Sequence, residues 1–239
     1  MHVMVIREKT ASQATARKLR AAGHVPVILP LMQIVPEAGH IPDGQFDAVA
    51  FTSAFAPALL RRMEKAAHLV DLPAFCVGPA TANAARRVGF ADVRACGGSA
   101  QTLAAQLIAA FEGKAAHVLY PAAREKAFDL AAAAEDCGLS VMEFVLYAAD
   151  LVDPGRNALA SALERTAGGA VLIHSARSAG HLAHLIEKHD LLPLAASLTF
   201  IAISENVAET ARRALPAENF EFLVAKLPEE DAMLSLIEN

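Results

Sequence analysis

The chain has 239 residues and a formal net charge of −5, and 54% of its residues are hydrophobic while only 5% are aromatic. This length accommodates one large or two small domains, with cores built mainly from alanine, leucine and valine. The negative net charge excludes a general electrostatic attraction to nucleic acid or to an anionic membrane surface. We therefore expect neither as a partner, and an anionic ligand must be held by local groups.

The three cysteines, Cys76, Cys96 and Cys137, are odd in number and widely spaced. They form no CxxC pair, which is typical of a reduced cytoplasmic protein with unreactive thiols. The apolar run at residues 3–6 is too short for a signal peptide, and no stretch approaches the ~20 apolar residues of a membrane span. We expect a cytoplasmic protein without a membrane segment.

Short apolar runs alternate with amphipathic segments along the whole sequence. The runs predict strands at residues 3–6, 25–29, 31–36, 47–51, 74–77, 92–96, 116–120, 141–147, 170–173, 199–204 and 220–225. The segments between them predict helices at residues 12–22, 57–67, 82–88, 102–111, 126–137, 178–189, 207–215 and 229–237. Because strands that alternate with helices form βα units on parallel sheets, the predicted fold class is α/β.

The stretch from Ala74 to Gly89 shows the local pattern most clearly. A buried strand is stopped by Gly78-Pro79, and Thr81 precedes an Ala-rich helix that ends at Gly89. A helix N-terminus at the carboxyl edge of a sheet offers backbone N–H groups and the positive end of the helix dipole. Such a place suits a carboxylate or a phosphate, although an ordinary strand-to-helix connection has the same sequence.

The same pattern of segments occurs twice along the chain. The spacing of the matched positions drifts, as loop insertions in an old duplication would produce. The sequence therefore predicts two copies of one α/β half. The matched positions are Gly23 with Gly138, Ser53 with Ser175, Gly78 with Ser204, and Arg7 with Arg124.

Several short motifs follow one another in a fixed order. They are Arg7, Gly23, residues 30–34, Phe51-Thr52-Ser53-Ala54, residues 77–82, Arg124, Tyr147 and Ser175. In order, spacing and duplication these motifs resemble the uroporphyrinogen-III synthase family, and the resemblance covers essentially the whole chain. This family closes hydroxymethylbilane to a macrocycle, with loss of water and inversion of the last pyrrole ring.

The resemblance implies two similar doubly wound, parallel-sheet α/β domains, which are flavodoxin-like halves with exchanged βα pieces. The first domain would comprise residues 1–35 and 150–239, and the second residues 37–148. Two linker strands, at about residues 31–36 and 143–149, would join them as a hinge. Such a hinge lets domains open and close around a ligand.

The resemblance also implies an enzyme, a hydro-lyase of tetrapyrrole and haem biosynthesis. Its substrate, hydroxymethylbilane, carries eight carboxylates and a terminal hydroxymethyl group. Uncatalysed closure already occurs and gives the uninverted isomer, so the enzyme must mainly hold a conformation. The family therefore implies no metal and no cofactor, and it implies a monomer that makes at most transient contact with hydroxymethylbilane synthase.

Residue roles follow from the same resemblance. Tyr147 would be the acid that assists loss of the hydroxyl, although a tyrosine at the end of a strand is as often a packing residue. The hydroxyl residues of the binding set also suit helix capping, and the arginines also suit a solvated surface. The implied substrate-binding residues are Arg7, Thr52, Ser53, Ala54, Gly78, Thr81, Arg124, Ser175, Ser204 and Asn206.

Two departures from the family pattern leave alternatives open. Residues 204–207 replace a second Gly-Pro-Thr-Thr-like turn and add Glu205 near an expected carboxylate site, and only Arg7 remains of a Thr-Arg-Pro segment near the start. A hinged, non-catalytic sensor of an anionic small molecule and a catalytically inactive relative are the alternatives. Nucleotide-binding, hydrolase and zinc-protease motifs are missing. The histidines at 181, 184 and 189 suit a solvated helix better than a metal site.

Overall fold

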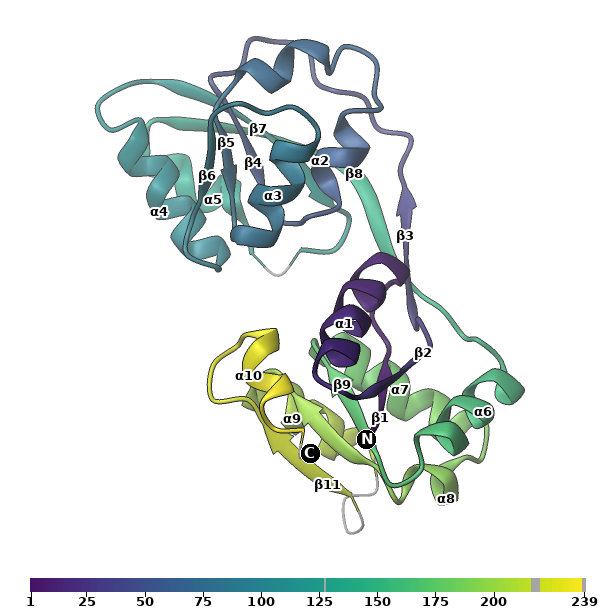
Figure 1. Cartoon of the computed structure of the whole chain (residues 1–239). Coiled ribbons are helices and arrows are strands. Elements are labelled where there is room, and N and C mark those ends of the chain that lie inside the picture. The colour runs from purple at the N-terminus through teal and green to yellow at the C-terminus, as the bar shows by residue number, and fades with distance from the viewer. Residues whose placement is uncertain (127, 216–219, 238–239) are drawn as a thin grey trace. The chain divides into compact units, whose positions relative to one another are not determined.

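The computed structural model describes residues 1–126, 128–215 and 220–237 (Figure 1). The chain divides into two compact units. Unit 1 comprises Met1–Gln33 and Asp150–Asn239, and unit 2 comprises Ile34–Ala149. Each unit is organised around a sheet of its own.

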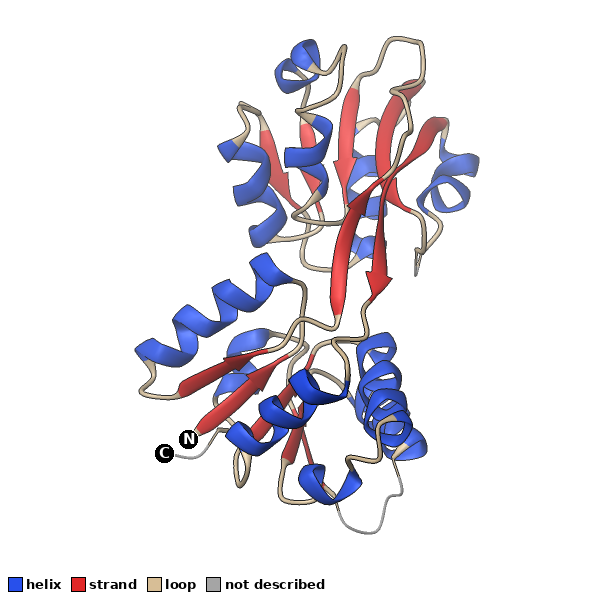
Figure 2. Ribbon diagram, turned by 90° about the vertical axis from the view of Figure 1, so that its right-hand side faces the viewer, coloured by secondary structure: helices blue, strands red, loops and turns tan. Residues whose placement is uncertain are grey.

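The sheet of unit 1 has five strands in the order β11-β10-β9-β1-β2, all paired in parallel. Helices lie on both of its faces, with α6, α7, α8 and α9 on one and α1 and α10 on the other (Figure 2). The strands are β1 His2–Val5, β2 Val25–Ile28, β9 Ala170–Ile173, β10 Thr199–Ala202 and β11 Glu221–Val224. The helices are α1 Lys9–Ala21, α6 Arg156–Thr166, α7 Ala176–Lys188, α8 Leu192–Ala195, α9 Glu205–Ala214 and α10 Glu230–Leu234.

The sheet of unit 2 has six strands in the order β3-β8-β7-β4-β5-β6, and those from β8 to β6 are parallel. Helices α2 and α3 lie on one face, and α4 and α5 on the other. The strands are β3 Met32–Pro36, β4 Ala48–Phe51, β5 Ala74–Cys76, β6 Val93–Ala95, β7 Ala116–Ala123 and β8 Leu139–Leu151. The helices are α2 Ala56–Leu60, α3 Pro79–Arg87, α4 Ala100–Ala110 and α5 Leu130–Ala134, with short 3₁₀ helices η1 Ala67–Asp71 and η2 Glu135–Cys137.

Successive strand side chains point to opposite faces, and each face has its own core. In β1, Met4 is buried among the residues of α6 to α9, whereas Val5 is buried toward α1 and α10. In β4, Phe51 packs toward α2 and α3, whereas Ala50 packs toward α4. Since both faces are covered, the inner strands β4, β5 and β9 are apolar throughout rather than alternating. The predicted doubly wound, parallel α/β class is confirmed.

The two sheets share one strand order once β3 is left aside. The sequence β2-β1-β9-β10-β11 in unit 1 corresponds to β8-β7-β4-β5-β6 in unit 2. In unit 1 the βαβ piece β1-α1-β2 belongs to the first copy of the repeated pattern, and it lies beside three strands of the second copy. In unit 2 the piece β7-α5-β8 belongs to the second copy, and it lies beside three strands of the first. β3 and β8 both cross the division between the units, and a hinge at these strands stays a prediction.

Two helices of unit 2 are shorter than predicted. α2 ends at Leu60 instead of residue 67, because the following residues are mostly charged and exposed and provide no apolar face to bury. In this segment Lys65 has a left-handed φ of 65°, and a right-handed helix cannot continue through a residue in that conformation. The helix predicted at 126–137 begins at Leu130, where the side chain of Asp129 caps it. Residue 127 lies outside the described residues.

Two helices, α6 and the short α8, were missed, and two strands, β7 and β8, are longer than predicted. No helix was expected in α6, although its buried residues Leu159, Ala162, Leu163 and Thr166 have helical spacing. β7 continues through Pro121 to Ala123, beyond its predicted end at residue 120. The recorded pairing of β7 with β4 ends at Leu119, so the missing N–H of Pro121 removes no bond from that ladder.

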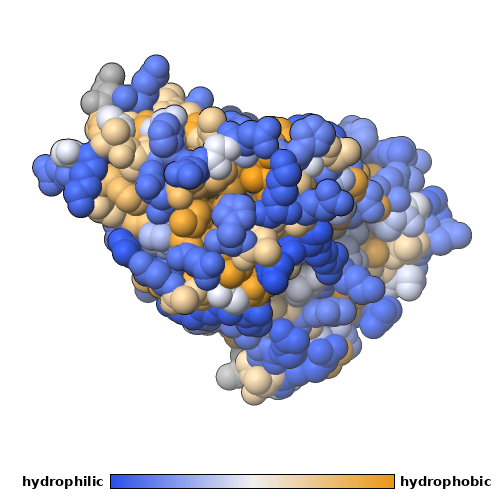
Figure 3. Space-filling view, turned by 90° about the horizontal axis from the view of Figure 1, so that it is seen from above, coloured by the Kyte–Doolittle hydropathy of each residue, from blue (hydrophilic) through white to orange (hydrophobic). Residues whose placement is uncertain are grey.

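The helices are short, and the surface shown in Figure 3 is largely hydrophilic. No helix within the described ranges is both long and apolar enough to cross a bilayer. On the face drawn in Figure 3, hydrophilic side chains are widespread and smaller apolar patches lie between them.

The close approach of β9 to β1 generates a prediction about Gly169. A Cβ added at Gly169 would collide with the carbonyl oxygen of His2 and lie 2.8 Å from that of Thr166. We expect G169A to lower the free energy of unfolding by about 1–3 kcal/mol, as overpacking does. Urea denaturation followed by circular dichroism measures this.

The matched control is G180A in α7, where an added Cβ would meet only Thr210 Cγ2, at 4.0 Å. Replacing a helical glycine by alanine stabilises by about 0.5–1 kcal/mol. Equal effects of the two substitutions would contradict the close packing described for Gly169.

Candidate active site

A pocket of about 340 Å³ lies in unit 2, at the carboxyl ends of β4, β5 and β7. This edge is where open α/β sheets bind ligands, because the strand-to-helix turns gather there. The pocket combines hydroxyl groups, one lysine and apolar walls. Its lining residues are Thr52, Val77, Ala100, Tyr120, Ala123, Glu125, Lys126, Phe128 and Tyr147.

The two tyrosines of the chain, Tyr120 and Tyr147, both line this pocket. Each of them contacts one of the two hydroxyl residues that directly follow β4. Thr52 Oγ1 lies 2.9 Å from the hydroxyl of Tyr120, and either group can donate the hydrogen bond. Ser53 lies near the hydroxyl group of Tyr147 and acts to lower the pKa of that phenol. Each phenol therefore has beside it one of the two hydroxyl residues that follow β4.

Both phenols are buried, with Tyr120 2% and Tyr147 4% exposed. Burial raises the pKa of each, since an ionised phenolate would lose its hydration, and the nearby hydroxyl groups of Thr52 and Ser53 offset only part of this. The two groups are also close enough for Tyr120 to raise the pKa of Tyr147 further. Both phenols are consequently neutral proton donors near pH 7.

A charged pair lies beside the tyrosines. Lys126 Nζ is 2.6 Å from Oε1 and 2.5 Å from Oε2 of Glu143, which lies opposite Tyr120 in the pairing of β7 with β8. The carboxylate raises the pKa of Lys126, so the ammonium group stays charged. The ammonium group of Lys126 in the pocket is therefore already paired with the carboxylate of Glu143.

The other predicted residues of unit 2 lie in turns at the same edge of the sheet. Ala54 follows Ser53, whose hydroxyl accepts from the N–H of Phe55 at 3.2 Å. Gly78, not Thr81, is the N-cap of α3, because Pro79 is the first helical residue and its fixed φ suits that position. Thr81 is instead buried in the first turn of the helix, at 5% exposure. Arg124 follows β7 and forms an ion pair with Glu37.

The predicted residues of unit 1 lie at the carboxyl ends of β1, β9 and β10. Ser175 caps α7, because its hydroxyl accepts from the N–H of Ser178 at 3.1 Å. Ser204 occupies the N-cap position of α9 without a capping bond from its side chain, and the exposed Asn206 lies in the first turn. The added charge of Glu205 is balanced by Arg212 at 2.5 Å.

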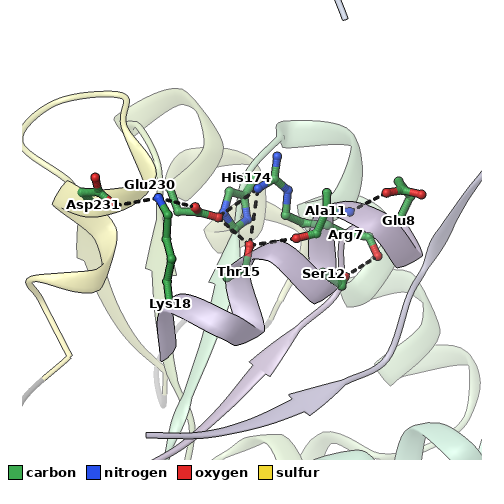
Figure 4. A network of polar contacts seen from close by, with 9 residues as sticks. All are labelled: Arg7, Glu8, Ala11, Ser12, Thr15, Lys18, His174, Glu230 and Asp231. Carbon is green, nitrogen blue, oxygen red and sulfur yellow. Dashed lines mark hydrogen bonds and ion pairs between the residues drawn. The ribbon is translucent and has the colours of Figure 1, made fainter. Parts of the chain in front are cut away.

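Arg7 lies in a polar network of unit 1 that is centred on the carboxylate of Glu230 (Figure 4). Glu230 Oε1 is 3.0 Å from Arg7 Nη1 and 2.5 Å from Thr15 Oγ1, and Oε2 is 2.8 Å from Lys18 Nζ. Arg7 was expected to bind a carboxylate of the substrate, and in this structure it binds the carboxylate of Glu230. These contacts tie the start of α10 to α1.

His174 completes the network from the end of β9. Its Nε2 lies 3.6 Å from Glu230 Oε1, and within the described structure neither ring nitrogen has a hydrogen-bond partner. Burial lowers the pKa of His174. Although burial raises the pKa of Glu230, its contacts with His174, Lys18 and Thr15 hold that pKa well below its usual range.

The structure brings together Thr52, Ser53 and Tyr147 of the predicted residues, and it adds Tyr120 and Lys126, which sequence reasoning missed. The signal for Tyr120 was that it is one of only two tyrosines and ends a predicted strand. Nothing in the sequence paired Arg7 with Glu230, which lies far along the chain. Among the described residues, no group of three or more His, Cys, Asp or Glu side chains could hold a metal ion.

The fold and the pocket define a two-unit α/β protein with exchanged βα pieces and a hydroxyl-lined site at a sheet edge. Residues 13–235 match the family described as Uroporphyrinogen-III synthase HemD. The chain therefore belongs to the uroporphyrinogen-III synthase family, which are lyases of haem biosynthesis. No curated protein matches the sequence significantly.

Two solved structures are similar over nearly the whole chain. The uroporphyrinogen-III synthetase from Helicobacter pylori is 20% identical with a TM-score of 0.63, over 98% of this chain and 97% of that chain. A mutant uroporphyrinogen III synthase from Thermus thermophilus is 16% identical with a TM-score of 0.50, over 98% and 96%. At these identities the likeness establishes the fold.

The network around Glu230 predicts that acid weakens unit 1. The lowered pKa of Glu230 means that its stabilisation is present above the unfolded value of about 4.3 and is lost as the pH falls toward the folded value. The lowered pKa of His174 acts in the same direction from about pH 6.5 downward, because only the unfolded ring is then protonated. We expect E230Q to lower the free energy of unfolding at pH 7 by about 1–2 kcal/mol.

Urea denaturation of the wild type and E230Q between pH 7 and pH 3 measures this, and the difference should shrink once the pH falls below the unfolded value of about 4.3. D231N is the matched control, because the side chain of Asp231 is 79% exposed although it contacts Lys18. We expect D231N to change the free energy of unfolding by less than about 0.5 kcal/mol. An E230Q effect no larger than that of D231N would contradict the role given to Glu230.

Proposed function

We propose that this chain closes hydroxymethylbilane to uroporphyrinogen III, with inversion of the last pyrrole ring, in the pocket of unit 2. Family membership supports the reaction, and the environment of Tyr147 supports the place. This phenol is buried, lines the pocket, lies near Ser53 and remains protonated near pH 7. It is therefore suited to give a proton to a leaving hydroxyl group.

In this proposal the proton of the Tyr147 hydroxyl passes to the oxygen of the terminal hydroxymethyl group. The carbon–oxygen bond then breaks and water leaves, which generates a cation conjugated with the pyrrole. The substituted carbon of the last ring attacks this cation to form a spiro intermediate, which fragments and recloses with the ring inverted. The proton that the attacking terminal carbon loses on final closure returns to the Tyr147 oxygen, so the cycle releases only water.

The carboxylates of the substrate need several anion-binding groups. We propose the backbone N–H groups at the starts of α3, α7 and α9 for this role, where the helix dipoles are positive. Arg7 and Arg124 already form ion pairs with Glu230 and Glu37, so a substrate carboxylate would replace an internal one at each. The proposed binding residues are Arg7, Thr52, Ser53, Ala54, Gly78, Thr81, Arg124, Ser175, Ser204 and Asn206.

We also propose that the chain acts as a cytoplasmic monomer whose two units move about β3 and β8. Hydroxymethylbilane would reach it from hydroxymethylbilane synthase by transient contact. The family resemblance supports these proposals, and the two crossings of the chain between the units are compatible with a hinge.

A coupled assay tests the proposed reaction. Hydroxymethylbilane is generated in place by its own synthase, and the product is oxidised and its isomers are separated by chromatography. We expect mostly the type III isomer with the wild-type chain and the type I isomer without it. Y147F should lower the rate of type III formation by about 100-fold, because the proton donor is lost while the ring is kept.

The urea denaturation of Y147F provides the control for its folding. If the wild type yields only the type I isomer at every protein concentration, the enzymatic proposal fails, and a sensor of anionic tetrapyrroles is then tested by fluorescence binding. If the wild type is active and a folded Y147F is equally active, the role of Tyr147 fails alone.

The burial of Tyr147 also fixes the pH dependence of the reaction. Because its pKa is raised above the usual value of about 10, the phenol keeps its proton throughout the neutral and mildly alkaline range. We expect kcat to show no decline from this group between pH 7 and pH 9. An alkaline decline with an apparent pKa below 9 that is present in the wild type and missing in Y147F would contradict this assignment.

A further inference from the structure

Tyr120 has no part in the function proposed above, yet it shares the pocket with Tyr147. Its side chain is 2% exposed, and the accessible remainder lines the pocket. A buried phenol that only filled space could be replaced by phenylalanine, which needs no polar partner. The position of its hydroxyl group at the carboxyl edge of the sheet therefore calls for a functional explanation.

The two tyrosines reach the pocket from opposite faces of the sheet. The ring of Tyr120 packs in the core on the side of α4 and α5, and the ring of Tyr147 in the core on the side of α2 and α3. Thr52 and Ser53 follow β4 directly. The hydroxyl group of Thr52 contacts Tyr120, and Ser53 lies near Tyr147.

The bond between Thr52 and Tyr120 leaves hydrogen-bonding capacity for a ligand. A hydroxyl group carries one proton and two acceptor positions. At the 2.9 Å separation, one group of the pair donates to the other, and the accepting group keeps its own proton. Because both residues line the pocket, that proton is available to an oxygen atom of a bound molecule.

We propose that Tyr120 is a second catalytic residue of this chain, which together with Thr52 hydrogen-bonds the hydroxymethyl oxygen of the substrate while Tyr147 protonates it. The inference rests on the proposed function. The hydrogen bond holds the oxygen beside the Tyr147 phenol, and it stabilises the electron density that the oxygen gains as its bond to carbon breaks. No proton is transferred from Tyr120, so the balance of the reaction is unchanged.

The coupled assay with purified Y120F, T52V and T52S tests the proposal. Y120F removes only the oxygen atom, and we expect its kcat for type III formation to fall about tenfold, the value of one hydrogen bond, with KM changing less than about threefold. T52V should have a similar effect, whereas T52S keeps the hydroxyl group and should retain most of the activity.

The double variant Y120F/Y147F separates a catalytic from a structural role. If both phenols act on one oxygen, the loss in the double variant is smaller than the product of the two single losses. A purely structural Tyr120 would instead give multiplicative losses, together with a lower urea midpoint for Y120F, and this would overturn the proposal.

The possible failures are distinguishable. An inactive wild type overturns the proposed function itself. An active wild type with Y120F at the wild-type rate overturns the role of Tyr120 alone. If Y120F does not fold, T52V decides the question, because wild-type kcat in T52V would also overturn the proposal.

Discussion

The structure depends on two strand pairings between parts of the chain that are far apart in sequence. In unit 1, β1 pairs with β9 and Val3 lies opposite Ala170; in unit 2, β4 pairs with β7 and Ala48 lies opposite Val118. Each pairing places a βαβ piece from one half of the chain beside three strands from the other. Because all four strands run parallel to their partners, the carboxyl ends gather at one edge of each sheet.

The chemistry of the pocket follows from this pairing. Tyr120 belongs to β7 and Thr52 follows β4, so their hydrogen bond exists only because those two strands are neighbours. Tyr147 lies one strand further on, opposite Ala123 and beyond a register shift in β7. The shift falls between Ala122 and Ala123, so Tyr120 pairs with β8 before it and Tyr147 pairs with β7 beyond it. The site therefore belongs to the assembled sheet and to no single segment of the sequence.

The sequence predicted what depends on local pattern. Strands with both faces buried are short apolar runs, so β1, β4 and β9 were located to within about a residue. Thr81 was misplaced as a cap because Pro79 begins the helix earlier, and α6 was missed although its apolar spacing was present. Tyr147 was singled out by family resemblance, and its catalytic role stays a prediction. Tyr120 and the partnership of Arg7 with Glu230 escaped because periodicity carries no information on which distant turns meet.

The two units use the same fold in different ways. In unit 2 the sheet edge leaves a pocket lined by hydroxyl groups. In unit 1 the corresponding edge holds Glu230 of the chain itself among Arg7, Thr15 and Lys18 (Figure 4). The duplication therefore preserved the strand order while the side chains at the two edges diverged.

The central claim is that the reaction takes place at the end of β4, between Tyr120 and Tyr147. A crystal structure of the chain with uroporphyrinogen III bound tests it most directly. The account predicts that the macrocycle contacts the hydroxyl groups of Thr52, Tyr120 and Tyr147. A product that is bound elsewhere and contacts neither tyrosine would contradict it.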